Sequence, residues 1–145
     1  MASRRRKPQS RPGLDELGRS PLHDAAREGN ATRCAALLAG GADAGARDDG
    51  GWTPLHFAAQ AQSAAVTALL LDAGAALEAR DAFGNTPLWR ATMASSGDGE
   101  VIGLLRRAGA DPYATNDSGV APVDLARTIA NFQVARFYSD LPENP

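Results

Sequence analysis

Three side chains in this sequence, His23, Cys34 and His56, are of the types that bind metal ions or act as nucleophiles. Imidazole nitrogens and thiolates are the usual protein ligands of zinc, and a structural zinc site needs four ligands. The histidines lie 33 residues apart, and no cluster of cysteine, histidine or carboxylate side chains completes a set of ligands around them. A single cysteine also excludes an intramolecular disulfide bond. We therefore expect neither a metal site nor a cofactor.

The segment GLDELGRS, Gly13 to Ser20, is close to the spacing of a phosphate-binding loop. However, Arg19 stands where that motif needs lysine, no predicted strand precedes the segment, and Ser20 is followed by proline as at a helix start. No G-x-S-x-G nucleophile elbow occurs in the chain. Cys34 falls on an apolar helical stripe, so we expect a small core residue rather than a nucleophile. The sequence therefore gives no indication of an enzyme.

Four similar segments recur along the chain, SPLHDAA, TPLHFAA, TPLWRAT and APVDLAR. Their prolines, Pro21, Pro54, Pro87 and Pro122, are separated by 33, 33 and 35 residues. A fixed period in this range is typical of stacked-repeat proteins. A hydroxyl side chain before proline caps a helix and proline fits the first helical position, so the pattern predicts that helices start here.

The second unit, residues 48–80, shows what each repeat contains. Glycines in its first residues indicate a tight turn. Two apolar stripes at helical spacing follow, Leu55, Ala58 and Ala59, then Val66, Leu69, Leu70 and Ala73. Gly74 is expected to end the second helix. Two short helices cannot bury their apolar faces alone, so neighbouring units must stack on both sides.

This pattern resembles the ankyrin repeat, a β-turn followed by two antiparallel helices around a TPLH motif. The residues that carry the resemblance recur in the turn (Gly18, Gly51, Gly84, Gly119), in the second helix (Leu37, Leu70, Leu105) and at its end (Gly41, Gly74, Gly109). The resemblance implies an all-α solenoid of four helix-turn-helix repeats with β-turn tips. It also implies that His23 and His56 are structural, with rings that form hydrogen bonds to neighbouring turns.

We expect a single ankyrin domain over residues 15–138, between a basic N-terminal tail (1–14) and a C-terminal tail (139–145). Its repeats are predicted at about 15–47, 48–80, 81–115 and 116–138.

Three departures from the pattern stand out. Gln62 stands where the family usually has glycine, and the third unit has two extra residues within MASSGDGE. The second helix of the fourth unit, NFQVARFYSD, is predicted to be a capping helix whose outer side is more polar and faces solvent.

Basic residues are concentrated at the N-terminus, where Arg4, Arg5, Arg6, Lys7 and Arg11 are five of the 15 in the chain. The rest carries 10 basic and 17 acidic side chains, which disfavours nucleic acid as the main partner. A disordered leader, a nuclear-import patch and a contact with nucleic acid or membrane all remain open for the basic segment. No apolar run approaches the ~18 residues of a membrane span, and no secretory signal is visible. With one cysteine, we expect a cytoplasmic protein without a membrane partner.

The resemblance implies that a partner protein binds at the turn tips and the concave face of the first helices. The expected anchors are Trp52, Phe57, Phe83, Trp89 and Met93, with a polar rim of Arg19, Asp24, Arg27, Asp49, Gln60, Arg80, Asn85 and Arg90. Tryptophan and arginine are the residues most often found at interface hot spots. Phe57 and Trp89 could instead pack between repeats.

Several segments, TPLW, GDGEVIGLL, NDSGVAPVDLARTIAN and VARFYSDLP, are similar to those of small free-standing bacterial ankyrin proteins. Some of these are immunity proteins, so the resemblance implies an inhibitor of a cognate toxin, with an acidic concave face that would suit a basic toxin such as a nuclease. The alternative is an adaptor that localises its partner without inhibiting it. An enzyme or phosphate-binding protein that uses residues 13–20 is a further alternative, and so is a designed ankyrin binder. Three irregularities favour a natural origin: Gln62, the two-residue insertion in the third unit, and Arg33, which stands where the later units have valine.

Overall fold

The structure is a computed structural model that describes residues 11–128 and 132–142. The basic residues at positions 4–7, most of the predicted N-terminal tail and the end of the C-terminal tail lie outside the described residues. The described part contains the α-helices α1 (Pro21–Arg27), α2 (Ala31–Ala39), α3 (Pro54–Gln60), α4 (Ala64–Asp72), α5 (Pro87–Ala94), α6 (Glu100–Arg107), α7 (Pro122–Thr128) and α8 (Phe132–Ala135), then a 3-10 helix, η1 (Arg136–Tyr138). No β-strand occurs in these residues, and the predicted all-α fold is confirmed.

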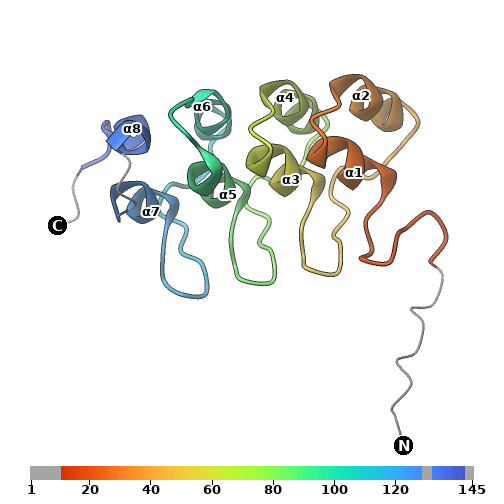
Figure 1. The fold of residues 1–145 in the computed structure, drawn as a ribbon, viewed down its shortest axis with the longest axis horizontal. Coiled ribbons are helices and arrows are strands. Elements are labelled where there is room, and N and C mark those ends of the chain that lie inside the picture. Colours follow the sequence, from red (N-terminus) through yellow and green to blue (C-terminus); the bar gives the residue numbers. More distant parts are fainter. Residues whose placement is uncertain (1–10, 129–131, 143–145) are drawn as a thin grey trace, which may run out of the picture.

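The helices form two parallel rows (Figure 1). The first row contains α1, α3, α5 and α7, and the second contains α2, α4, α6 and α8. The long loops that lead into α3, α5 and α7 all project from the same side of the stack (Figure 1). None of the helices in the described part of the chain has the length and apolar character needed to cross a bilayer.

The helices of the first row start as the sequence predicts. The side chains of Ser20, Thr53 and Thr86 each accept a hydrogen bond from the backbone N–H three residues on, and proline occupies the first turn of the helix that follows. Two second-row helices are capped in the same way by Asn30 and Ser63. Each cap satisfies a backbone donor that has no partner inside the helix.

The core lies between the two rows. Equivalent positions of the first helices supply Leu22, Leu55, Leu88 and Val123, and the second helices supply Cys34, Val66, Leu70, Val101, Leu105 and Val134. Burial raises the pKa of the Cys34 thiol, which keeps it protonated and supports the predicted role as a core residue. Arg33 is exposed on α2, the second-row helix at the open end of the stack.

Both histidine rings are structural, as the resemblance implied. The Nδ1 atom of His56 accepts from the backbone N–H of Thr53, while its Nε2–H donates to the backbone carbonyl of Asn85 at 2.8 Å. His23 does the same with Ser20 and with the carbonyl of Trp52, the latter at 2.9 Å. Each ring therefore joins the start of one repeat to the turn of the next, and both of its nitrogens are occupied.

Gln62 adopts the left-handed conformation that glycine favours, with a φ of 56°. The equivalent residue of the first repeat is Gly29, which has a φ of 68°. The side chain of Gln62 donates hydrogen bonds to the carbonyls of Ala59 and Ala91, and so links the second repeat to the third. These two bonds offset the strain of a positive φ in a residue other than glycine.

The fourth unit closes the stack with less helix than its sequence predicts. The helix α8 has 4 residues and continues as a single turn of 3-10 helix. Val134 and Tyr138 are fully buried, and the Tyr138 hydroxyl lies 2.6 Å from the Thr92 hydroxyl on α5. Phe137 covers Gly99 at the end of the longer loop in the third repeat, where a β-carbon would overlap its ring.

Candidate functional site

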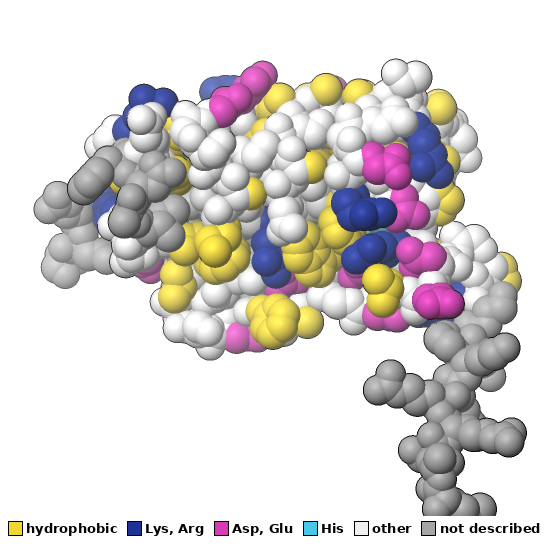
Figure 2. All heavy atoms as spheres, in the orientation of Figure 1, with side chains coloured by type: hydrophobic (Ala, Val, Ile, Leu, Met, Phe, Trp, Pro, Cys, Tyr) yellow, Lys and Arg dark blue, Asp and Glu magenta, His cyan; other side chains and the backbone are white. Residues whose placement is uncertain are grey.

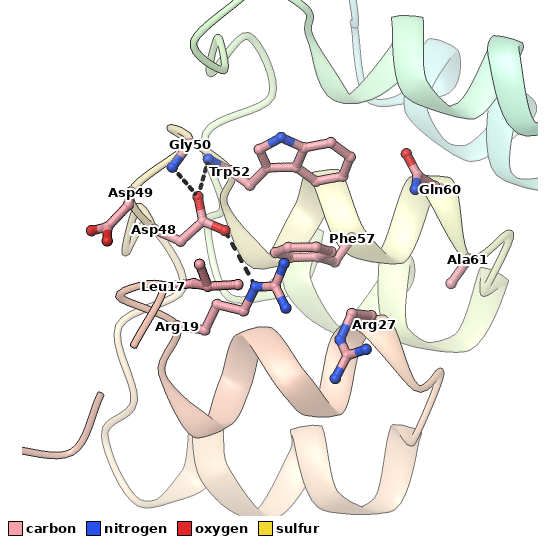
Figure 3. A pocket seen from close by; sticks show the side chains of 10 residues that line it. All are labelled: Leu17, Arg19, Arg27, Asp48, Asp49, Gly50, Trp52, Phe57, Gln60 and Ala61. Carbon is pink, nitrogen blue, oxygen red and sulfur yellow. Dashed lines mark hydrogen bonds and ion pairs between the residues drawn. The ribbon is translucent and has the colours of Figure 1, made fainter. Parts of the chain in front are cut away.

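An aromatic and cationic stack runs along the first-row side of the first three repeats. The rings of Trp52 and Phe57 pack with 4.7 Å between their centroids. The guanidinium group of Arg19 lies 5.1 Å from the Phe57 ring, and that of Arg90 lies 4.2 Å from the Trp52 ring. In Figure 3, Trp52 and Arg19 lie on opposite sides of Phe57. We call these four residues the Arg–aromatic stack.

The position of Trp52 is fixed by its turn. One carboxylate oxygen of Asp48 accepts the backbone N–H groups of Gly50 and Trp52, at 2.9 and 2.8 Å. Gly51 has a φ of 77°, and a β-carbon at this position would lie 3.0–3.1 Å from the backbone of Asp81 and Ala82 in the next turn. The turn therefore requires glycine for both its conformation and its packing. With the His23 bond to the Trp52 carbonyl, these contacts fix the backbone of Trp52, and the contacts with Phe57 and Arg90 then position its indole.

Arg90 is held over the Trp52 ring by a buried carboxylate. Its Nε and one terminal nitrogen donate to the same oxygen of Asp81, at 3.0 and 2.6 Å, and the Asp81 side chain is fully buried. Burial alone would raise the pKa of Asp81, but the hydrogen bonds from Arg90 and from the backbone of Asn85 and Phe83 outweigh it and leave this pKa below its ordinary value. Asp81 is a residue that the sequence reasoning missed, although DAFGN repeats the turn pattern of DDGGW.

A hollow of about 650 Å³ opens beside the stack (Figure 3). It is lined by Leu17, Arg19, Arg27, Asp48, Asp49, Gly50, Trp52, Phe57, Gln60 and Ala61. These residues come from the first two turns and from the ends of α1 and α3. Figure 2 shows apolar and arginine side chains alternating across the middle of one face of the molecule. The volume is that of a site for a side chain or a short segment rather than a closed cavity.

Six of the predicted binding residues line this hollow, namely Arg19, Arg27, Asp49, Trp52, Phe57 and Gln60. The structure adds Leu17, Asp48, Gly50 and Ala61, which the sequence reasoning missed. The sequence pattern identifies Gly50 and Asp48 as turn residues, but it does not indicate that they lie near Phe57.

The other predicted residues lie outside the hollow, most of them nearer the third repeat. Phe83 and Met93 are 68% and 55% exposed, whereas Asn85 is buried and accepts a hydrogen bond from the Asn116 side chain. Arg80 donates to the carbonyls of Gly84 and Thr115, and so links two turns. Trp89 is half-buried, and its Nε1–H has no partner among the described residues. Asp24 lies 3.6 Å from Arg27 on α1.

The carboxylates at the hollow are engaged within the protein, which differs from the expectation of an acidic concave face. Asp48 accepts from its own turn, and both oxygens of Asp49 accept from Arg11, at 2.7 and 2.9 Å. The hydrogen bond from Arg11 lowers the pKa of Asp49. Turn formation uses one oxygen of Asp48, because aspartate is selected at turns for the bonds it makes to the following backbone N–H groups, whereas Asp49 is engaged by an ion pair.

The phosphate-loop and metal hypotheses find no site in the described part of the chain. The Ser20 hydroxyl bonds to the His23 ring and to its backbone N–H, so it belongs to a helix cap. No group of three histidine, cysteine or carboxylate side chains that could hold a metal ion occurs among the described residues.

Comparison with known proteins agrees with this geometry. A family profile described as ankyrin repeats in three copies matches residues 22–116, which is more than half of the chain. The fourth helix pair, α7 and α8, lies beyond the matched residues. No curated protein matches the chain. Ankyrin repeats are protein–protein interaction modules and are typically non-catalytic. The chain belongs to the ankyrin-repeat family.

Proposed function

We propose that this ankyrin protein has a non-enzymatic role and binds a partner protein through the surface formed by the Arg–aromatic stack, its hollow, and the exposed side chains Phe83 and Met93. The observation that carries the proposal is that the stack is already built in the free protein. Trp52 is held by the bond from His23 of the preceding repeat and Arg90 by Asp81 of its own repeat, and the surface beside them stays open. A preformed surface loses little conformational freedom on binding.

The size and composition of this surface favour a protein partner over a small molecule. Arg27, Gln60 and Met93 occupy the same position in three successive first-row helices, so the surface extends over three repeats. Phe83 stands at a turn tip with 68% of its surface exposed, where it contributes little to the core. Exposed aromatic and methionine side chains beside arginine are the composition of interface hot spots.

Two roles fit such a surface. The resemblance to small bacterial ankyrin proteins supports a cytoplasmic inhibitor that covers the active site of a cognate toxin. An adaptor that localises its partner would use the same contacts and leave the partner active. Fold alone does not distinguish them, because the same solenoid serves many functions. The distinction is made by the activity of the partner in the complex.

The test is affinity capture from cells that express the protein, with the bound proteins identified by mass spectrometry. The variant Phe83→Ala/Met93→Ala removes two exposed anchors at little cost to the fold. Tyr113→Ala is the matched control, because Tyr113 is 44% exposed but lies in the segment after α6. We expect a partner that is retained by the control and lost by the double variant. A partner that the double variant retains would contradict the proposal.

The purified partner then distinguishes the two roles. If its own activity disappears on addition of the wild-type protein and persists with the double variant, the protein is an inhibitor. Unchanged activity in a complex of demonstrated stability assigns the adaptor role.

A further inference from the structure

The hollow beside Phe57 contains hydrogen-bond donors without acceptors, and this imbalance indicates which chemistry it binds. The side chain of Arg19 makes no hydrogen bond to any described residue. Its Nε is buried, and the nearest carboxylate oxygen, on Asp48, is 3.6 Å away. Arg27 is equally distant from its nearest carboxylate, with 3.6 Å to Asp24, and its side chain is 51% exposed. A contact of this length is an ion pair without a hydrogen bond.

Three of the four carboxylate oxygens of Asp48 and Asp49 at the same hollow already accept hydrogen bonds, and the fourth, on Asp48, is the one 3.6 Å from Arg19. The Asp48 oxygen that does not face Arg19 accepts two backbone N–H groups of its turn. Both oxygens of Asp49 are bonded by Arg11. A basic segment that entered the hollow would have to displace these bonds, whereas an acidic segment would meet two guanidinium groups that have ion pairs but no side-chain hydrogen bonds.

The arrangement of Arg19 adds a geometric argument. The guanidinium carbon of Arg19 lies 5.1 Å from the centre of the Phe57 ring, and this contact restricts the position of the group before binding. In Figure 3, Arg19 and Arg27 lie on the same side of that ring, on the side opposite Trp52. A guanidinium group in contact with an aromatic ring can still present two N–H donors to the two oxygens of a carboxylate.

Resting on the proposed function, we propose that the hollow binds an acidic segment of the partner protein, with an aspartate or glutamate carboxylate placed between Arg19 and Arg27. Gln60 stands at the rim, where its amide can donate to the same segment. The apolar side chains Phe83 and Met93 lie toward the other end of the surface. The partner segment is therefore acidic where it meets the first repeat and apolar where it meets the third.

The probe is a displayed library of random peptides of about 12 residues, selected against the wild-type protein in full length. We expect the selected peptides to be enriched in aspartate and glutamate over lysine and arginine. Synthetic copies of them should bind Arg27→Glu at least about tenfold more weakly than wild type. Arg33→Glu makes the same charge change at a side chain that is 45% exposed on α2, and we expect its affinity to be unchanged.

Selection against the Arg27→Glu protein completes the test, and the acidic enrichment should disappear there. Peptides with no acidic enrichment that still lose affinity in Phe83→Ala/Met93→Ala would overturn this inference and leave the proposed function standing. Peptides that bind Arg27→Glu and Phe83→Ala/Met93→Ala as tightly as they bind wild type would contradict the proposed function itself. Because Arg27 and Arg33 are both exposed, circular dichroism should show the same helix content in all three proteins.

Discussion

The junctions between repeats are of two kinds. At the first two, a buried histidine ring donates to the carbonyl of the next turn, from His23 to Trp52 and from His56 to Asn85. At the third, Trp89 occupies the histidine position and its indole N–H finds no partner among the described residues. There the Asn116 amide donates to the Asn85 side chain at 2.8 Å, beside the backbone bond from Asp117 to Phe83 that also joins the third and fourth turns.

This difference shows that a regular repeat and a closing repeat are stabilised by different means. The regular junctions share a histidine bond that recurs with the repeat period, beside a backbone bond between successive turns. The fourth unit has Asp124 at the histidine position, where it caps its own helix by accepting from Ala121. Its attachment depends on individual contacts, which include Tyr138 to Thr92 and the two-bond ion pair of Arg106 with Asp140. The central repeats are therefore expected to be uniform in stability, and the last one to depend on a few side chains.

The largest effect should come from removal of the Tyr138 ring. Tyr138→Ala deletes a fully buried ring and its hydroxyl contact with Thr92, which should cost about 3–5 kcal/mol at the C-terminal end. Because the loss is local, we expect amide hydrogen exchange to accelerate in α7 and α8 while α3 and α4 stay protected. Equal acceleration in all repeats would show that the closing unit is as strongly coupled as the others.

The regular junction is tested by the loss of one histidine. His56→Ala removes the ring that bonds Asn85, leaves that carbonyl without its donor in the core and opens a cavity. We expect a cost of about 2–4 kcal/mol in urea unfolding. Trp89→Ala is the comparison variant, because Trp89 holds the same position without any such bond, and it should cost less. A larger loss for Trp89→Ala would reverse the ranking of the two junctions.

The sequence predicted the repeated part of this molecule well and the individual contacts poorly. Proline spacing, caps and apolar stripes located the first three helix pairs, because these features recur with the period. The short α8, the bond between Tyr138 and Thr92, and the burial of Asp81 each depend on a single approach of distant residues. Pattern reasoning identified Trp52, Phe57 and Arg90 individually, but the stack they form with Arg19 required the turn of one repeat to be placed against the helix of another.

Two turn glycines with the same conformation separate packing from backbone strain. Gly51 and Gly119 both have a φ of 77°, but a β-carbon at Gly51 would press on the next turn and one at Gly119 would meet nothing within 4 Å. Gly119→Ala should therefore cost only the strain of a left-handed alanine, about 1 kcal/mol, while Gly51→Ala should cost about 2–3 kcal/mol. Thermal unfolding of the two variants measures the difference. Equal costs would indicate that the turns do not pack tightly in the middle of the stack.

The smallest effect is a dependence on pH that should arise at the His56 junction. Burial lowers the pKa of His56, and its bond to the Asn85 carbonyl only partly opposes this. The unfolded chain therefore takes up a proton at this ring at a pH where the folded protein does not. The contribution of the neutral His56 ring to the free energy of unfolding is complete above the unfolded pKa of about 6.5. It decreases as the pH falls from there toward the lower pKa that His56 has in the folded protein.

We therefore expect the melting temperature of the wild type to fall between about pH 7 and about pH 5.5, and to fall less in His56→Gln, which cannot titrate there. Asp81 stays ionised over this range because its pKa lies below its ordinary value, so the Arg90 contact does not contribute to the change. Trp89→Gln is the matched variant at the third junction, where no ring titrates, and its slope should equal that of the wild type. If His56→Gln kept the full wild-type slope, the titration would have to arise elsewhere, and the regular junction would be neutral to pH.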